Sequence, residues 1–394
     1  MPVYISPVVP TAHRPNNHYC LISKKESKSM KLSAPRENLL APLQSVMGVV
    51  ERRQTMPILA NVLLTARNDR LSVTGTDLEV ELVASSAVTV QQAGDITVPG
   101  RKLLDIVRTL PEKTTVNLTR DGEKVVLKAG RSRFTLSTLP ATEFPLIEDI
   151  NARQTLRIDR KQAHRLIEKT HFAMAQQDVR YYLNGTLLET NGKQLRAVAT
   201  DGHRLSLAEA ELMEATSGSY QVILPRKGVL ELQRVLSGDG ELELTIGTNH
   251  IRAQIGDIRF TSKLIDGKFP EYGRVIPANS PRVMTASRDA MRQALQRTSI
   301  LSNEKYRGVR LTFATNLLTI QAHNPEQEEA EDQLEVSFAG EEIEIGFNVT
   351  YLLDALAAVD AETVEVGLTD ANSSCVIRTP GDQSIKFVVM PMRL

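Results

Sequence analysis

The sequence predicts an α+β protein built from three copies of one unit, each with two helices packed on antiparallel sheets. Two observations lead to this prediction. A short strand, a polar turn and an amphipathic helix follow one another three times, at residues 32–43, 156–167 and 284–295. Later landmarks then return at a nearly constant distance along the chain. A long period with little identity between copies is typical of duplicated domains rather than of a solenoid.

The landmarks are a proline and a phenylalanine in each of the first two copies. Pro99 and Pro225 are 126 residues apart, and Phe134 and Phe260 are also 126 apart. Phe387 follows Phe260 after 127 residues. Because three independent pairs share one spacing, we interpret the repeat as real.

Each copy contains two passages from a strand into a helix. In the opening passages, given above, the apolar residues of the helix recur at intervals of three and four, as one buried helix face requires. The second passages lie at residues 96–107, 222–232 and 345–356. Two helices per unit are therefore expected.

Strands fill the rest of each unit. A closing strand is expected at residues 133–136, 259–262 and 386–389, and an inner strand at 71–74, 195–199 and 317–321. Gly, Asn and Asp pairs interrupt these runs, as tight hairpins require. Each unit then has about eight antiparallel strands, which excludes a doubly wound nucleotide-binding fold.

The length of 394 residues fits three domains of ordinary size. We expect domains at residues 30–149, 150–277 and 278–394. Residues 1–29 are rich in Pro, Asn, His and Ser, and they lack both the apolar core of a signal peptide and helical periodicity. They are expected to form a disordered N-terminal extension.

The composition indicates a reducing compartment, which we expect to be the cytoplasm. The chain has only two cysteines, Cys20 and Cys375, in distant segments. This argues against a disulfide framework and against a thiolate metal site. No apolar stretch reaches the length of a membrane span.

Signatures of catalysis are scarce, so we expect no enzyme, no cofactor, no metal and no catalytic residue. The sequence has no phosphate-binding Gly-rich loop, no Gly-x-Ser-x-Gly and no His-Glu-x-x-His. The acidic run at residues 326–332 reads better as a solvated strand edge or partner patch than as a metal site. The segment 201–204, Asp-Gly-His-Arg, holds a possible acid–base pair, although a tight polar turn is the favoured reading.

Charge is balanced overall, with 47 basic and 47 acidic side chains, but it is unevenly placed. Residues 30–149 carry 15 basic and 14 acidic side chains, whereas residues 278–394 carry 10 and 17. Such opposed ends favour head-to-tail contact between two copies, which closes into a ring when the geometry permits. The expected contact residues are Arg131, Arg133, Phe134 and Leu136 on an edge strand, with Ile300 and Leu301 at the other end of the chain.

The expected ring has the right size for DNA. A domain of about 120 residues is roughly 35 Å across, and six such domains enclose a hole of about the same width. Duplex DNA is on the order of 20 Å across. Basic residues near helix starts would attract phosphates without reading sequence; they are Arg101, Lys102, Lys161, His164, Arg165, Arg226, Lys227, Arg288 and Arg292.

Four segments resemble one known family, the bacterial sliding clamps, the β subunit of DNA polymerase III. They are residues 177–185 (QDVRYYLNG), 199–205 (ATDGHRL), 324–330 (NPEQEEA) and the C-terminal 389–394 (VMPMRL). The resemblance covers essentially all of residues 30–394. It implies three DNA-clamp domains, assembled as a head-to-tail homodimeric ring that slides on double-stranded DNA as a processivity factor.

The resemblance also implies partners and a site for them. Clamps tether the replicative polymerase α subunit, and they bind the clamp loader, other polymerases and repair proteins through short motifs, often of a Gln-Leu-x-Leu-Phe type. The motif enters a hydrophobic pocket between the second and third domains. The matching residues here are Leu183, Thr200, Gly202, His203, Arg204, Leu205, Pro270, Val275, Asn348, Tyr351, Ser374, Val388, Met390, Pro391, Met392, Arg393 and Leu394.

Residue chemistry agrees with such a pocket. Leu, Val, Pro and Met can form an apolar wall for Leu and Phe anchors, with His203 and Arg204 as donors on its rim. Asn372 stands where clamps often carry an apolar residue, which bears on the partner preference of the outer part.

By the same resemblance, the DNA-contacting residues are expected to be Arg53, Tyr181, Tyr182, Arg226 and Lys227. A tyrosine pair suits stacking at a single-strand junction, and two tyrosines that merely pack a loop are the alternative. Two rival functions rank below the clamp. One is a metal-dependent enzyme that modifies DNA, and the other is a scaffold unrelated to DNA.

Overall fold

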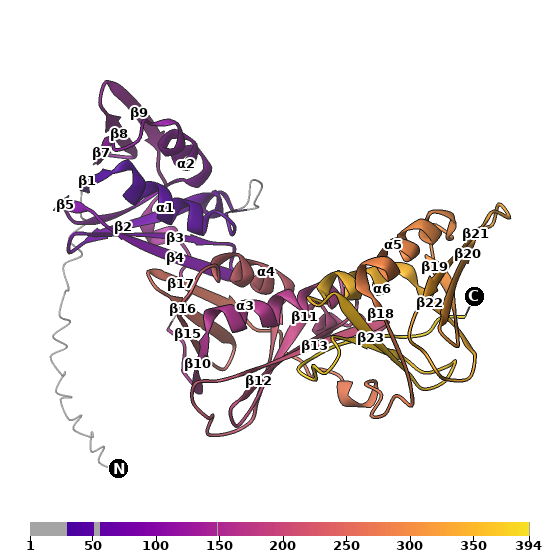
Figure 1. The fold of residues 1–394 in the computed structure, drawn as a ribbon. Helices are drawn as coiled ribbons and strands as arrows, with labels where there is room; N and C mark the ends of the chain where they lie inside the picture. The colour runs from indigo at the N-terminus through magenta and orange to yellow at the C-terminus, as the bar shows by residue number, and fades with distance from the viewer. Residues whose placement is uncertain (1–29, 51–55, 148, 394) are drawn as a thin grey trace, which may run out of the picture.

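The computed structural model describes residues 30–50, 56–147 and 149–393, so the predicted extension at 1–29 lies outside the described part of the chain. Three sets of elements follow one another along a crescent, and the helices of all three lie along its concave side (Figure 1). We call these sets the first, second and third unit.

The first unit has two helices and nine strands. Its elements are β1 (Lys31–Pro35), α1 (Arg36–Val46), η1 (Pro57–Ala60), β2 (Asn61–Arg67), β3 (Arg70–Thr76), β4 (Val80–Ala87), β5 (Thr89–Gln92), β6 (Gly94–Pro99), α2 (Gly100–Thr109), β7 (Thr115–Asp121), β8 (Lys124–Ala129), β9 (Ser132–Ser137) and η2 (Ala141–Glu143). The short strand β5, which pairs with β1, is the one more than the eight expected.

The second unit has two helices and eight strands. Its elements are β10 (Gln154–Asp159), α3 (Arg160–Glu168), η3 (His171–Ala173), η4 (Tyr181–Leu183), β11 (Gly185–Asn191), β12 (Gln194–Thr200), β13 (Arg204–Glu211), β14 (Tyr220–Pro225), α4 (Arg226–Val235), β15 (Glu241–Ile246), β16 (His250–Ile255) and β17 (Ile258–Lys263). The short helix η5 (Tyr272–Arg274) follows it.

The third unit repeats this order. Its elements are β18 (Arg282–Ser287), α5 (Arg288–Thr298), η6 (Ser299–Leu301), β19 (Gly308–Ala314), β20 (Leu317–His323), β21 (Glu329–Glu335), β22 (Ile343–Asn348), α6 (Val349–Ala358), β23 (Thr363–Leu368), β24 (Cys375–Arg378) and β25 (Ile385–Val389). The α+β class and the threefold repeat predicted from the sequence are confirmed.

Helices α3, α5 and α6 start at polar side chains that cap them, whereas α1, α2 and α4 follow a proline and have no such cap. The Asp159 side chain accepts a hydrogen bond from the Gln162 amide (3.1 Å) at the start of α3, and Asn348 accepts one from the Thr350 amide (2.9 Å) at the start of α6. Such caps satisfy amides that the first helical turn leaves without partners. The two helices of each unit then pack against each other.

Two large sheets join the units. One has the order β10-β15-β16-β17-β4-β3-β2-β6, and the other β14-β11-β12-β13-β25-β24-β23-β18. The two joints are built in the same way. In each, the last strand of one unit pairs antiparallel with the fourth strand of the preceding unit: β17 pairs with β4, and β25 pairs with β13. The closing phenylalanines occupy the same register, because Phe260 lies opposite Leu82 and Phe387 opposite Ser206.

The first and third units each have a strand at the edge of a sheet. The remaining sheets have the orders β5-β1-β7-β8-β9 and β21-β20-β19-β22, so β9 and β21 lie at sheet edges. They are at opposite ends of the crescent (Figure 1). A single apolar core runs through all three units, with Phe260, Phe313 and Phe387 among its most buried side chains.

Candidate partner-binding surface and its residues

An apolar cluster covers the sheet face opposite the helices where the second and third units meet. Its buried members come from both units: Leu187, Val198, Leu205, Leu207, Ile223, Phe269, Val376 and Val388. The antiparallel pairing of β13 with β25 sets Leu205 directly opposite Val388. Tyr182, Ile265, Tyr272, Val275 and Ile276 pack around them and stay partly exposed. We call this set the joint cluster.

The C-terminal segment is tied to both units beside the joint cluster. The Met390 amide donates to the His203 carbonyl (2.9 Å), and the Met392 amide donates to the Gly346 carbonyl (2.8 Å). Met390, Pro391 and Met392 are half-buried. Flexible Met side chains on such a surface can adapt to different apolar ligands.

The turn between β12 and β13 is built by its own polar side chains. The Thr200 hydroxyl donates to the Arg204 carbonyl (2.6 Å), and the Asp201 carboxylate accepts from the amides of His203 (2.9 Å) and Arg204 (3.0 Å). Gly202 has a φ of +91°, and a Cβ atom there would lie 2.9 Å from a guanidinium nitrogen of Arg180. The left-handed backbone therefore favours glycine here, and a Cβ atom would also displace the Arg180 guanidinium.

Arg204 differs from the rim donor that the sequence suggested. Its guanidinium donates to Asp201 Oδ2 (3.0 Å), to the Phe172 carbonyl (2.7 Å) and to Asp354 Oδ2 of α6 (2.5 Å). It also lies over the Tyr351 ring, 4.6 Å from the centroid. Its donors are thus used inside the chain, and it ties the second unit to the third.

His203 is the exposed polar group of this turn. Its ring stacks on that of Tyr351, with centroids 6.5 Å apart and planes inclined by 16°. Burial, together with the negative charge of Asp201, raises the pKa of the Tyr351 hydroxyl above its usual range. The Tyr351 ring therefore remains a neutral, flat surface beside the joint cluster over the physiological range.

The residues predicted for the partner pocket differ in exposure. Leu183, Thr200, Leu205 and Val388 are buried; Gly202, Val275, Asn348, Tyr351, Ser374 and Met390 are half-buried; His203, Pro270 and Arg393 are exposed. Leu394 lies outside the described residues. Asn372 is exposed in the loop before β24.

Sequence reasoning missed Arg180 as a neighbour of this surface. Arg180 makes a two-pronged contact with Asp178 (3.0 and 2.9 Å) and donates to the Asp201 carbonyl (3.2 Å). The hydrogen bond from Arg180 lowers the pKa of the Asp178 carboxyl to about 2. The signal was available, because both residues belong to the segment 177–185 that carried the resemblance.

The residues expected at DNA are partly gathered. Tyr181 is 56% exposed, and its ring meets that of Tyr182 edge to face at 5.8 Å. The Arg226 amide donates to the Asn184 carbonyl (2.9 Å), which brings the start of α4 beside η4. Lys227 forms an ion pair with Asp77 of the first unit. Arg53 lies outside the described residues.

The residues expected at the dimer contact lie in the first and third units and differ in exposure. Arg131, just before the edge strand β9, and Arg133 within it have exposed side chains, whereas Phe134 is half-buried and Leu136 is buried. Ile300 in η6 is 76% exposed, which is unusual for an isoleucine. The acidic run forms the edge strand β21 and the turn before it, and Asp332 pairs with Arg297 of α5 (2.7 Å).

Neither a metal cluster nor a membrane-spanning helix is found in the part of the chain that the structure describes. No cluster of three or more His, Cys, Asp or Glu side chains suited to a metal ion occurs in residues 30–50, 56–147 and 149–393. Within the same ranges, no helix combines the length and hydropathy that a membrane crossing needs.

Family models match the chain in three consecutive parts. The N-terminal, central and C-terminal domains of the DNA polymerase III beta subunit match residues 30–148, 157–271 and 273–393. The chain belongs to the β sliding clamp family. Together these matches span most of the chain, in the order that the repeat requires.

Individual relatives agree. The beta sliding clamp of Pseudomonas putida is 52% identical over 367 residues, which cover 93% of this chain and all of that protein. The beta sliding clamp of Escherichia coli K12 is 51% identical over the same length. A crystal structure of the DNA polymerase sliding clamp from Pseudomonas aeruginosa with ligand superposes with a TM-score of 0.91 at 51% identity, covering 93% of this chain and all of that one.

As a member of the β clamp family, the chain is a processivity subunit of DNA polymerase III in DNA replication and has no catalytic activity of its own. Its fold is that of the ring-forming clamps. The prediction that the protein is not an enzyme is confirmed, and the reading as a metal-dependent DNA-modifying enzyme is excluded with it.

Proposed function

We propose that two copies of the chain close head to tail into a ring around duplex DNA and hold the replicative polymerase through the joint cluster. The observation that carries the ring is the repeated way in which the units join. Inside the chain, the last strand of one unit twice completes the sheet of the preceding unit. β9 is the last strand of the first unit and β21 is the fourth strand of the third unit. Both lie at sheet edges, so within one chain neither has the partner that its equivalents have at the two joints.

The repeat supports a specific register for the third joint. β21 pairs with β20 as β13 pairs with β12, so that Glu335 corresponds to Glu211 and Ala330 to Ser206. Since Phe387 lies opposite Ser206, Phe134 of one copy should lie opposite Ala330 of the second copy. Arg133 then lies opposite Glu331 of the second copy.

Charge favours the same pairing. β9 and the residue before it carry Arg131 and Arg133, whereas β21 carries acidic side chains at Glu329, Glu331, Asp332 and Glu335. Opposite charges on facing edge strands give each interface specificity, and like charges on two β9 strands or two β21 strands disfavour the wrong pairings. Phe134, Ile300 and Leu301 would supply apolar area to the seam, whereas Leu136 is already buried in the core of its own unit.

The seam can be tested by charge reversal. Arg133→Glu and Glu331→Arg should each weaken the dimer, by about tenfold for a pair worth ~1.4 kcal/mol, and the double variant should regain most of the loss. Dimer dissociation constants from analytical ultracentrifugation provide the measurement. Single variants that dimerise as the parent does, or a double variant no better than either single one, would reject this register.

For partners, we propose that the joint cluster and Met390 to Arg393 bind a short peptide with Leu and Phe anchors. The replicative polymerase, the clamp loader, other polymerases and repair proteins are the proposed carriers of such peptides. The buried Leu205 and Val388 give an apolar floor, and the half-buried Met390 and Met392 an adaptable wall. A clamp of Pseudomonas aeruginosa bound to griselimycin supports a ligand site in the family.

Deletion of Met390 to Leu394 tests the peptide site separately from the ring. The deleted chain should lose binding of a labelled Gln-Leu-x-Leu-Phe peptide, because it loses the wall that the hydrogen bonds from Met390 and Met392 hold in place. It should dimerise normally, since β9 and β21 are untouched. Normal peptide binding by the deleted chain would remove this segment from the site.

We propose that Tyr181, Tyr182, Arg226 and Lys227 face DNA. The end of η4 and the start of α4 are neighbours, which supports one DNA-contact region rather than two. Contacts to phosphates make such binding sensitive to salt and indifferent to sequence.

We also propose that the protein acts in the bacterial cytoplasm, and that its domain boundaries lie at residues 149/150 and 277/278.

The decisive experiment is retention on circular DNA. The protein is loaded on nicked plasmid with a clamp loader and ATP, isolated by gel filtration, and the plasmid is then linearised. Release only on linearisation is expected of a closed ring. Retention on linear DNA would mean direct binding, and a failure of capture with a competent loader would contradict the ring.

A further inference from the structure

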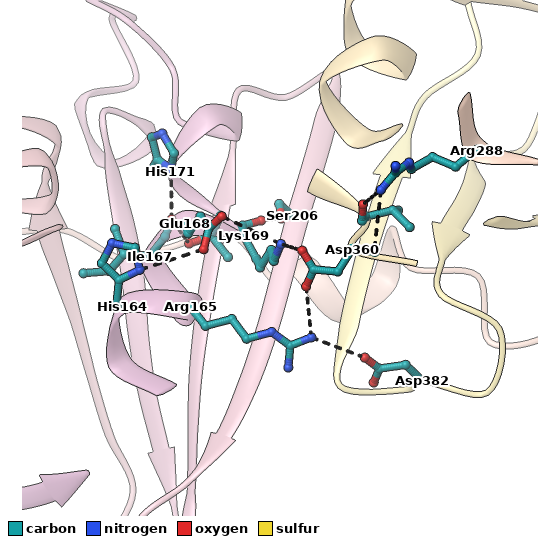
Figure 2. Close-up of polar contacts among 12 residues, drawn as sticks. His164, Arg165, Ile167, Glu168, Lys169, His171, Ser206, Arg288, Asp360 and Asp382 are labelled. Carbon is teal, nitrogen blue, oxygen red and sulfur yellow. Dashed lines mark hydrogen bonds and ion pairs between the residues drawn. The ribbon is translucent and has the colours of Figure 1, made fainter. Parts of the chain in front are cut away.

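An ion pair between a buried lysine and an exposed aspartate joins the second and third units on the side of the helices, away from the joint cluster. The Lys169 side chain at the end of α3 is 2% exposed and contacts Asp360, which follows α6. Arg165 adds contacts to Asp360 (3.4 Å) and Asp382 (4.0 Å). Figure 2 shows the two basic side chains reaching from one unit toward the two carboxylates of the other. We call Lys169, Arg165, Asp360 and Asp382 the latch.

Each half of the latch is fixed to its own unit. The Lys169 carbonyl accepts a hydrogen bond from the Ser206 hydroxyl of β13, and its amide donates to the Arg165 carbonyl (2.9 Å). On the other side, the Arg288 guanidinium donates to the carbonyls of Val359 (3.0 Å) and Asp360 (3.4 Å) (Figure 2). The ion pair therefore joins two anchored groups.

The electrostatics match a formed ion pair. Burial tends to raise the pKa of the Asp360 carboxyl, but the hydrogen bond and charge of Lys169, with the charge of Arg165, hold it below the usual range. A cavity of about 380 Å³ lies beside the pair and is lined by Lys161, His164, Arg165, Glu168, Lys169 and Leu236, among others. Water and salt ions can reach the pair from this cavity.

The joint between the first and second units has no counterpart of this pair. The three units can be aligned by one backbone hydrogen bond at the start of their first helices. The amide of Arg36 donates to the Thr114 carbonyl, that of Arg160 to the Gly240 carbonyl, and that of Arg288 to the Glu362 carbonyl. By this alignment the place of Lys169 is taken in the first unit by Ser45. The place of Asp360 is taken in the second unit by Gly238. At that joint, Arg234 donates to the Ser45 carbonyl instead (2.5 Å).

The latch is connected to the joint cluster by one strand and one helix. In β13, Ser206 bonds to Lys169 on the helix side, while its neighbour Leu205 belongs to the joint cluster on the opposite face. α6 carries Tyr351 and Asp354 beside the turn of residues 201–204 and leads directly to Asp360. A change in angle at the latch must therefore shift the two halves of the cluster against each other.

We propose that Lys169 and Asp360 are positioning residues of the peptide site, because they fix the angle between the units that form its two halves. The proposal rests on the peptide site proposed above. It distinguishes this joint from the one between the first and second units, where Arg70 pairs with Asp257 and Lys227 with Asp77 but the equivalent place holds Ser45 and Gly238.

The test compares Lys169→Met and Asp360→Asn with Lys161→Met. Lys161 lies on the same helix and pairs with Asp239 inside the second unit (2.5 Å), so its loss controls for removing one charge from α3. Spin labels at Glu214→Cys and Glu341→Cys, exposed positions of the second and third units, report the distance between units. Cys20 is replaced by Ser, and fluorescence polarisation gives the affinity for a labelled Gln-Leu-x-Leu-Phe peptide.

Lys169→Met and Asp360→Asn should each broaden the distance distribution and lower the affinity for the peptide by roughly three- to tenfold. Lys161→Met should leave both the distribution and the affinity unchanged. The double variant Lys169→Met/Asp360→Asn leaves no unpaired buried charge, so it should fold and still show the broad distribution. An unchanged distribution in the double variant would overturn the proposal, as would a broadened one with unaltered peptide affinity. If the parent chain binds no peptide, the proposed peptide site fails, while the distances still decide whether the latch fixes the joint.

Discussion

Replacing Arg204 by Met separates a donor that touches the ligand from one that holds the site together. Met keeps most of the length of the side chain and removes the guanidinium. Three hydrogen bonds disappear, to Asp201, to the Phe172 carbonyl and to Asp354. Of these, only the bond to Asp354 and the contact with the Tyr351 ring connect the second unit to the third.

The size of the effect follows from those two contacts. Asp354 is 39% exposed, so solvent screens its ion pair with Arg204 and we assign it ~1 kcal/mol. The guanidinium over Tyr351 adds ~1 kcal/mol at a partly exposed site. A total of ~2 kcal/mol corresponds to a factor of about 30, so Arg204→Met should weaken an apolar peptide by roughly 10- to 30-fold.

The assay uses two labelled peptides, Gln-Leu-x-Leu-Phe and the same sequence with Ala in place of Gln. If Arg204 acts by holding the turn against α6, Arg204→Met weakens both peptides by the same factor. Arg310→Met is the control, because Arg310 forms a half-exposed pair with Glu344 (3.4 Å) within the third unit. A loss confined to the Gln peptide would refute the reasoning, since it would show that Arg204 bonds to the ligand directly.

Four further outcomes are expected. Cys375 is buried, and burial raises the pKa of its thiol to about 12. In a Cys20→Ser chain, a thiol reagent at pH 8 should therefore label Cys375 only after unfolding in urea, and rapid labelling of the native chain would contradict this. Burial also raises the pKa of the Glu81 carboxyl above its usual range, so the unfolded chain loses this proton first as pH rises. Glu81→Gln should therefore leave the melting temperature unchanged near pH 4 and raise it relative to the parent at pH 7, and equal differences at both pH values would argue against it. The Asp178 carboxyl should titrate in ¹³C NMR with a midpoint of about 2 and move toward 3.8 in Arg180→Met, unless its hydrogen bonds with Arg180 do not form in solution. Calorimetry should count one apolar peptide per chain, and a count of two would mean that the joint between the first and second units binds as well.

The repeat made most of the fold predictable. Phe134, Phe260 and Phe387 marked closing strands correctly. Phe260 and Phe387 are buried at the same register, whereas Phe134, on the edge strand β9, is half-buried. β5 was missed since its four residues, Thr89–Gln92, carry no apolar alternation, and only pairing with β1 makes them a strand.

The site was less predictable than the fold. The buried Leu205 and Val388 could be expected from their apolar character, but the fate of Arg204 could not. Its three acceptors lie 32 residues before it, 3 before it and 150 after it in the sequence. The same holds for Lys169 and Asp360, which are 191 residues apart and meet only because β13 pairs with β25. Long-range ion pairs leave no local pattern for a sequence to display.

The repeat also explains why equivalent joints need not bind the same ligand. The two joints share one strand register, so strand residues of the joint cluster have equivalents between the first and second units. Leu205 corresponds to Glu81, Val376 to Arg252 and Val388 to Thr261.

There the floor is polar and already occupied. Glu81 is 1% exposed and accepts a hydrogen bond from the Ile147 amide (3.0 Å), and the Arg252 guanidinium donates to the Thr261 hydroxyl (3.3 Å). An apolar anchor placed on this floor would desolvate charges without offering them partners, which costs more free energy than its own burial returns. The strand ladder therefore fixes where a site can form, and the side chains on its outer face restrict the apolar peptide to one joint of each chain.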